Sequence, residues 1–137
     1  MMISTKGRYA LRVMIVLAEH NTGAYIPLLD IAKRQEISEK YLESIVSVLS
    51  KMGFVDAMRG KGGGYRLNRA PDAYTVGSIL KAIEGSLAPV ACLDAHPNTC
   101  KRAAECRTLG MWQSLYRLID DFFEGITIAD LVRDESV

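Results

Sequence analysis

Three cysteines are the residues of this 137-residue chain best suited to hold a reactive cofactor, and all lie within residues 92–106. Seven residues separate Cys92 from Cys100 and five separate Cys100 from Cys106. Paired zinc ligands usually have only about two to four residues between them. An iron–sulfur cluster, 2Fe–2S or 4Fe–4S, suits the segment better, because it needs thiolates and accepts a fourth ligand other than cysteine. Basic neighbours would favour the thiolate forms: Lys101, Arg102 and Arg107.

The spacing of the cysteines leaves other interpretations open. The thiols could be inert, could act as an oxidation switch, or could bind zinc together with His96. His96 or Asp94 could also serve as a fourth ligand of an iron–sulfur cluster, as could water or a small thiol. A cysteine-dependent enzyme is not indicated, because no paired base or oxyanion motif accompanies any of the three thiols.

Overall composition indicates a cytoplasmic protein. An odd number of cysteines is not typical of a disulfide framework. The first 20 residues mix charges with apolar residues, unlike a signal peptide, and no apolar run approaches the ~20 residues of a membrane span. We therefore expect no membrane partner.

The segment from Ile31 to Asn68 predicts two short helices followed by a hairpin. Ser38 is a good N-cap for the second helix. Its apolar residues recur at helical spacing and predict one buried face: Leu42, Ile45, Val46, Leu49 and Met52. The opposite face is polar and could enter a DNA major groove, although such faces are more often simply solvated: Lys40, Glu43, Ser44, Ser47, Ser50 and Lys51.

The hairpin strengthens the nucleic-acid interpretation. Gly53 can end the helix, residues 54–59 and 65–69 alternate as strands, and the turn GKGGG at 60–64 is almost all glycine. Such a turn can lie close to a polyanion, and a long cation at its base can enter a minor groove. A nucleotide-phosphate loop is excluded, because Gly62 follows Lys61 where that motif needs Ser or Thr. The cations around the turn are Arg59, Lys61, Arg66 and Arg69.

Charge divides the chain into two predicted domains. Residues 1–75 contain 11 Lys and Arg against 7 Asp and Glu, whereas residues 76–137 contain 6 against 9. The basic part would be a winged helix-turn-helix DNA-binding domain, and the acidic part would contain the cysteine loop and a dimerisation helix. The predicted fold class is therefore mainly α with a small β-hairpin wing.

The remaining elements are expected as follows. Thr5 would cap a first helix running to about His20, and residues 26–28 would form a strand beside the wing. Residues 29–35 would form the next helix, and Glu36 in the turn after it would either tolerate a strained backbone or mark a slightly different turn. The segment APDAY at 70–74 would be a linker, and Thr75 would cap a helix ending at Gly85. A last short helix is expected in TIADLV, at 127–132.

The longest predicted helix, from about 108 to 124, carries a broad apolar surface. A small winged domain cannot cover all of it, so we expect it to pack against its copy in a homodimer rather than fold back on its own domain. Two recognition helices would then read a pseudo-palindrome in grooves roughly 34 Å apart. The residues of this surface are Met111, Trp112, Leu115, Leu118, Ile119, Phe122 and Phe123.

Over nearly its whole length the chain resembles the IscR, NsrR, RirA and CymR family of bacterial winged-helix regulators, the Rrf-two type. The matching motifs are STKGRYALRVM at 4–14, ISEKYLESI at 37–45, RGKGGGYRL at 59–67, VGSILKAIEG at 76–85, and the cysteine loop followed by Trp112 and ITIADLV. The resemblance implies homodimeric transcription factors, commonly repressors, that bind double-stranded DNA under the control of a cluster in the loop.

The resemblance also implies DNA contacts at Tyr41, Glu43, Ser44 and Arg59, with Glu43 accepting from a cytosine amino group. Together with the polar helix face and the wing, the predicted DNA-binding residues are Ser38, Lys40, Tyr41, Glu43, Ser44, Ser47, Arg59, Lys61, Gly62 and Gly63.

Two departures from the family leave the fourth cluster ligand unassigned. Leu109 stands where IscR-like members have histidine, and Arg8 stands where NsrR-like members have an acidic residue. The all-cysteine spacing resembles RirA, the iron-responsive branch. We therefore expect a labile cluster that responds to iron, oxygen or nitric oxide. The alternative is a regulator without a cofactor, controlled by a protein partner as CymR-like members are, or by thiol oxidation.

Overall fold

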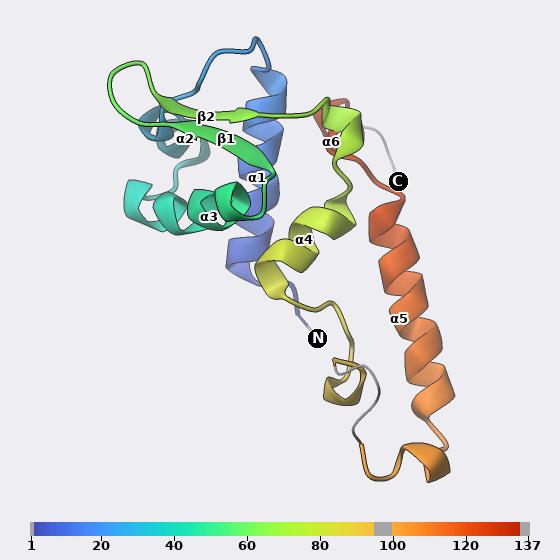
Figure 1. The fold of residues 1–137 in the computed structure, drawn as a ribbon. Coiled ribbons are helices and arrows are strands. Elements are labelled where there is room, and N and C mark those ends of the chain that lie inside the picture. The colour runs from blue at the N-terminus through green and yellow to red at the C-terminus, as the bar shows by residue number, and fades with distance from the viewer. Residues whose placement is uncertain (1, 95–99, 135–137) are drawn as a thin grey trace.

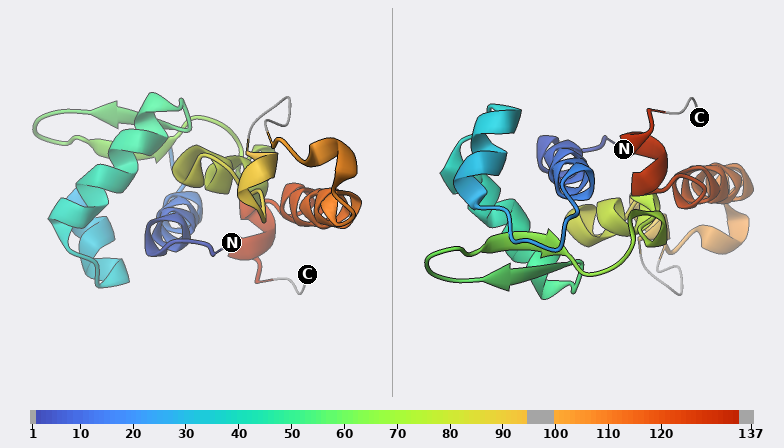
Figure 2. Two further views of the ribbon diagram at one scale, coloured as in Figure 1. Left: turned by 90° about the horizontal axis from the view of Figure 1, so that it is seen from below. Right: turned by 90° about the horizontal axis from the view of Figure 1, so that it is seen from above.

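Helices on either side of a central α1 form the architecture of the computed structural model, which describes residues 2–94 and 100–134 (Figure 1). The helix-turn-helix and the hairpin lie on one side of α1, and α4 and α5 lie on the other (Figures 1 and 2). This arrangement confirms the predicted fold class. The elements are α1 (Thr5–Glu19), α2 (Leu28–Gln35), α3 (Glu39–Lys51), β1 (Val55–Met58), β2 (Gly64–Leu67), α4 (Val76–Glu84), α5 (Leu109–Glu124) and α6 (Ile128–Val132). Short 3-10 turns are η1 (Pro71–Ala73), η2 (Ala91–Leu93) and η3 (Ala103–Glu105).

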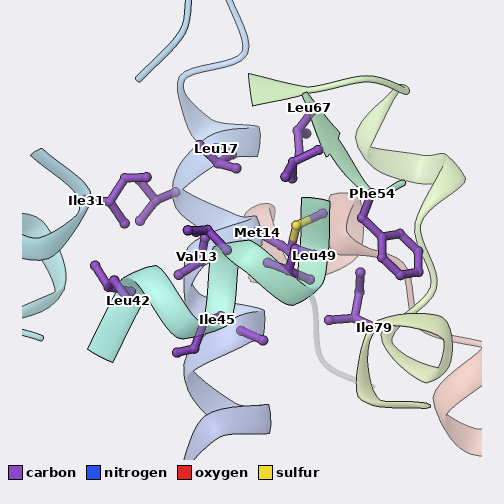
Figure 3. Close-up of a cluster of buried hydrophobic side chains, with 14 of the residues drawn as sticks. Val13, Met14, Leu17, Ile31, Leu42, Ile45, Leu49, Phe54, Leu67 and Ile79 are labelled. Atoms are coloured by element: carbon purple, nitrogen blue, oxygen red, sulfur yellow. The ribbon is translucent and has the colours of Figure 1, made fainter. Parts of the chain in front are cut away.

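The main core lies between α1 and α3 (Figure 3). Val13, Met14 and Leu17 of α1 are completely or almost completely buried, because they recur on one helical face. Each such side chain contributes about 1.5–3 kcal/mol by leaving water. Ile79 of α4 and Ile128 of α6 belong to the same core, so the packed interior continues past residue 75. The α3 residues in this core are Leu42, Ile45, Val46 and Leu49.

Two residues differ from the expected helix boundaries. Ser4, rather than Thr5, caps α1, and its Oγ accepts from the Gly7 N–H at 2.9 Å. Ser4 is held there because its N–H and hydroxyl both donate to Glu84 Oε1. Met52 is 55% exposed, because α3 ends at Lys51 and Met52 lies beyond its buried face. The expected caps Ser38 and Thr75 are confirmed.

The turn between α2 and α3 depends on a strained residue. Glu36 has φ 54° and ψ 42°, a left-handed conformation that costs a non-glycine residue about 1–2 kcal/mol. Its N–H donates to the Ala32 carbonyl, and the next residue, Ile37, is buried. Burial of Ile37 offsets the strain, so Glu36 tolerates a strained backbone, which is one of the two outcomes expected for this turn. The turn thereby sets the direction in which α3 leaves α2.

The hairpin is an antiparallel pair in which Val55 faces Leu67 and Met58 faces Gly64. Its only added partner within the described residues is a single bridge from Ile26 to Tyr65, with N–H to O distances of 2.8 and 2.9 Å. The prediction of a strand at 26–28 is therefore wrong except for Ile26, which forms this bridge, because Leu28 already begins α2. Gly64 is required here, since its φ is 146° and a side chain would collide with the Ile26 carbonyl.

The segment interpreted as a linker, residues 70–74, is instead an anchor. It forms η1, and Tyr74 is completely buried. The Tyr74 hydroxyl donates to the Phe54 carbonyl at 2.8 Å and accepts from the Asn68 N–H at 3.1 Å. Burial raises the pKa of the Tyr74 phenol above its ordinary value. Tyr74 therefore fixes both ends of the wing to the core.

Helix α5 lies at the outer edge of the molecule (Figures 1 and 2), and none of its residues is fully buried. Its inner face packs on a second, smaller core that includes Leu80 and Leu87. Lys81 of α4 forms salt bridges with Asp120 and Glu124 of α5, and these carboxylates raise the Lys81 pKa. Within the described residues, no helix has the length and apolar character needed to cross a membrane.

Candidate nucleic-acid interface and cysteine segment

The outward face of α3 is open. Lys40, Glu43 and Ser47 are exposed, and among the described residues neither Lys40 nor Glu43 forms a salt bridge. A carboxylate without a cationic partner can accept a hydrogen bond from a nucleobase amino group, as cytosine offers in the major groove. The helix can therefore present Glu43 to an external donor.

Two predicted contact residues on α3 are partly engaged within the protein. The Ser44 hydroxyl donates to the Tyr41 carbonyl at 2.7 Å, so its lone pairs remain to accept from a base or water. Tyr41 is 37% exposed, and its ring makes an edge contact with Tyr9 of α1, at 5.8 Å between ring centres. The Ser38 Oγ caps the helix by accepting from the Tyr41 N–H at 3.2 Å.

The four cations expected around the wing divide into two pairs. Arg66 donates to the Gly23 carbonyl at 2.8 Å, lies 3.6 Å from Asp56 and stacks on Tyr25. Arg69 donates to the Gly53 carbonyl and lies over Phe54. Both therefore have partners within the protein, although Arg66 is only half-buried and Arg69 is exposed.

Arg59 and Lys61 form the other pair. Both are exposed, and neither makes a salt bridge within residues 2–94 and 100–134. Gly62 is also exposed, whereas Gly63 is buried, and a side chain at Gly63 would collide with the Met58 carbonyl. The cationic tip of the wing therefore consists of Arg59 and Lys61, and Gly63 shapes the turn beneath them.

A hollow of about 290 Å³ separates α3 from the wing. The sequence did not single out its position, because the hollow arises only when the hairpin folds beside the last turn of α3. Two cations from different elements face it, so it suits a phosphate of a strand passing between helix and wing. It is lined by Ser47, Ser50, Lys51, Ala57, Met58, Arg59 and Tyr65.

The cysteine segment connects α4 to α5 (Figure 1). Cys100 and Cys106 are exposed and line one hollow of about 510 Å³, together with Arg102 and Arg107. Cys92 is half-buried in η2, apart from that hollow. Among the described residues, no three metal-ligating side chains are gathered into one group. Two of the three expected ligands are thus placed together.

Of the two side chains expected as a fourth ligand, the structure describes only Asp94. His96 lies outside the described residues. Asp94 is exposed, and its Oδ1 accepts from the Ser86 hydroxyl at 2.6 Å. That hydroxyl also accepts from the Ala88 N–H. The Asp94 carboxylate is therefore oriented by the chain that follows α4, with its second oxygen available to a ligand.

Cys106 has a thiol with a lowered pKa. The largest cause is its hydrogen bond with the Thr108 hydroxyl, 3.4 Å away, and the positive charge of Arg102 is a smaller one. The expected effect of basic neighbours on the thiol is present at Cys106 through Arg102, but it is smaller than that of Thr108. Thr108 was a missed contributor, although a hydroxyl two residues after a cysteine is visible in the sequence. A stabilised thiolate suits metal binding and oxidation alike.

Comparison with known proteins agrees with this geometry. A family model named Rrf2 and described as an iron-dependent transcriptional regulator matches residues 3–134. The HTH-type transcriptional regulator IscR of Erwinia tasmaniensis is 39% identical over 137 residues, covering 100% of this chain and 82% of that protein.

Two solved structures are similar over nearly the whole chain. CymR, described as the global cysteine regulator of B. subtilis, has a TM-score of 0.79 and 34% identity, covering 99% of each chain. IscR of T. potens has a TM-score of 0.75 and 35% identity, covering 98% of this chain and 88% of its own.

Proposed function

Because this chain belongs to the Rrf2 family of transcriptional regulators, we propose that it is a cytoplasmic homodimeric repressor whose operator binding responds to an iron–sulfur cluster. The observation that carries the DNA-binding part is the open face of α3 beside Arg59 and Lys61, which form no salt bridge among the residues that the structure describes. Glu43 supplies base recognition, and Arg59 and Lys61 supply sequence-independent attraction to the duplex.

Dimerisation is supported by the exposed apolar stripe of α5. Its residues are spaced by four, three and four positions, the spacing of a coiled-coil seam. Large exposed apolar patches on a small protein mark interaction surfaces. A second copy supplies the same stripe in return, which makes the interface self-complementary. The stripe consists of Met111, 55% exposed, Leu115, 37%, Leu118, 68%, and Phe122, 53%.

The sensing part is supported by the chemistry of the donor set. Three thiols occur in one segment, and two of them share a hollow with two arginines that offset negative charge. Cys92, Cys100 and Cys106 would hold the cluster, with Asp94 or His96 as a fourth ligand. When bound, such a cluster would react with oxygen and nitric oxide and would be lost when iron is scarce.

The contacts of α4 offer a route from the cysteine segment to the DNA-binding face. Glu124 of α5 accepts from the Thr75 hydroxyl at the start of α4, at 2.9 Å. At the other end of α4, Glu84 accepts from Ser4 at the start of α1. Through these contacts, a shift of α5 would be passed to α4 and α1. We propose that this shift changes the spacing of the two recognition helices.

Arg59→Ala should weaken operator binding about tenfold and lower the salt slope of log K by about one, because one cation leaves the duplex. Fluorescence anisotropy between 50 and 300 mM KCl (roughly the range in which such slopes are resolved) measures both quantities. Arg117→Ala is the matched control: it removes the same charge from the outer helix and should leave the slope unchanged. An unchanged slope for Arg59→Ala would remove this residue from the interface.

Selection of duplexes from a random library by anaerobically purified protein tests the proposed function. We expect the recovered sequences to share an inverted repeat and to bind two copies of the chain by sedimentation. Recovery of no common sequence, or binding of a single copy, would contradict the proposal.

A second candidate function follows from the exposure of Cys106. A thiol switch without a metal needs an accessible thiol that ionises readily, and Cys106 is exposed and has a lowered pKa. The other way in which a regulator without a cofactor could be controlled is by binding a protein partner. Iron and sulfide assays on anaerobic protein separate these from the cluster: colourless protein without either element would favour the cofactor-free regulator.

A further inference from the structure

Arg12 of α1 joins three elements of the DNA-binding half. Its Nε donates to the Gln35 Oε1 at 2.8 Å, and its terminal NH2 group donates to the Gln35 main-chain carbonyl at 2.6 Å. Gln35 is the last residue of α2, where a helical carbonyl has no partner within its own helix. Arg12 therefore caps α2 immediately before the strained Glu36.

The same guanidinium group is stacked over a tyrosine. The Arg12 Cζ lies 4.8 Å from the centre of the Tyr9 ring. Tyr9 in turn makes its edge contact, at 75° between ring planes, with Tyr41 in the first turn of α3. Thus one side chain contacts the end of α2 directly and reaches the start of α3 through Tyr9. Between these two contacts lies the turn that orients α3.

We infer that Arg12 is a positioning residue that sets the orientation of the recognition helix, rather than a phosphate contact. This inference rests on the proposed function. Both hydrogen bonds point inward to Gln35, so the charge is used within the protein. A planar guanidinium makes two hydrogen bonds in a fixed fork while its flat face stacks on a ring, whereas the compact ammonium of lysine has no such fork or face. Orientation matters because base edges are read only when side chains are aligned with them.

Arg12→Lys tests the inference because it keeps the charge and removes the geometry. The probes are the duplex selected by the native protein and a shuffled duplex of equal composition. We expect affinity for the selected duplex to fall about tenfold or more, since one aligned base contact is worth roughly that factor. Affinity for the shuffled duplex and the salt slope should stay unchanged, because no phosphate contact is lost.

Two further variants keep the result interpretable. Lys61→Gln in the wing should show the opposite pattern, a slope lowered by about one with discrimination between the duplexes retained. Gln35→Ala removes one acceptor of Arg12 without changing charge, so it should lose part of the discrimination between the two duplexes. This variant provides a test if the Arg12→Lys protein does not fold. Thermal unfolding of each variant establishes that the compared proteins are folded.

Native discrimination in both Arg12→Lys and Gln35→Ala would overturn the inference. A third variant, Arg12→Gln, removes the charge. If it lowered the salt slope but kept the discrimination between the duplexes, Arg12 would be a phosphate contact and the inference would be overturned as well. If the native protein selects no sequence at all, the proposed function fails first, and the role of Arg12 falls with it.

Discussion

Replacing Leu118 with glutamate should convert the proposed dimer into monomers and abolish tight operator binding. Leu118 is 68% exposed in one copy and lies in the middle of the apolar stripe of α5. Burying a leucine contributes about 1.5–3 kcal/mol, and a two-fold interface contains each residue twice. The dimer dissociation constant should therefore rise at least about 100-fold.

Sedimentation equilibrium measures this change, and operator titration measures its consequence. A monomer engages one half-site, so operator affinity should fall by about 100-fold or more. Gln113→Glu is the matched control, because it adds the same charge to the polar face of the same helix. A Leu118→Glu protein that remains dimeric would show that a different surface pairs the copies.

Replacing Cys106 with alanine should abolish iron and sulfide binding under anaerobic conditions. Loss of a direct ligand should exceed the roughly 10–100-fold cost of removing a second-shell partner. Cys92→Ala should have the same effect, although Cys92 lies apart from the hollow that Cys100 and Cys106 line. Iron and sulfide assays with absorption spectra provide the measurement.

Glu105→Gln is the control for the cysteine variants, because Glu105 lines the same hollow and the change leaves every thiol in place. Its iron content should equal that of the native protein. Full iron content in Cys92→Ala would restrict the ligands to the two cysteines that share the hollow and would contradict the three-cysteine site.

Periodicity and capping residues predicted the parts of the fold that local interactions decide. The buried face of α3 and the Ser38 and Thr75 caps follow from residues within one or two turns of each other. The open face that carries Glu43 followed from the same pattern. The apolar surface of α5 was also predicted, but two of its expected residues, Ile119 and Phe123, pack on the smaller core of their own domain.

Tertiary contacts decide what the sequence could not. Ser4 and Thr5 both have a hydroxyl able to cap α1, and Glu84, eighty positions from Ser4, selects Ser4. Tyr74 stands in a segment without periodicity, so its anchoring to Phe54 could not be inferred.

The wing and the cysteine segment show the same limit. Arg66 and Arg69 have the same composition-based signal as Arg59, yet each donates a hydrogen bond to a main-chain carbonyl distant in sequence. The relative placement of the three cysteines depends on how a segment without periodicity folds, which spacing alone does not give.

The most direct test of whether the exposed face of α3 reads DNA is to replace the base at each position of the selected operator. The change in binding free energy is then compared between the native protein and Glu43→Ala. We expect native protein to prefer one cytosine in each half-site by about 1–3 kcal/mol. The Glu43→Ala protein should lose that preference while the other positions keep theirs. An identical preference at every position in both proteins would contradict base recognition by this helix.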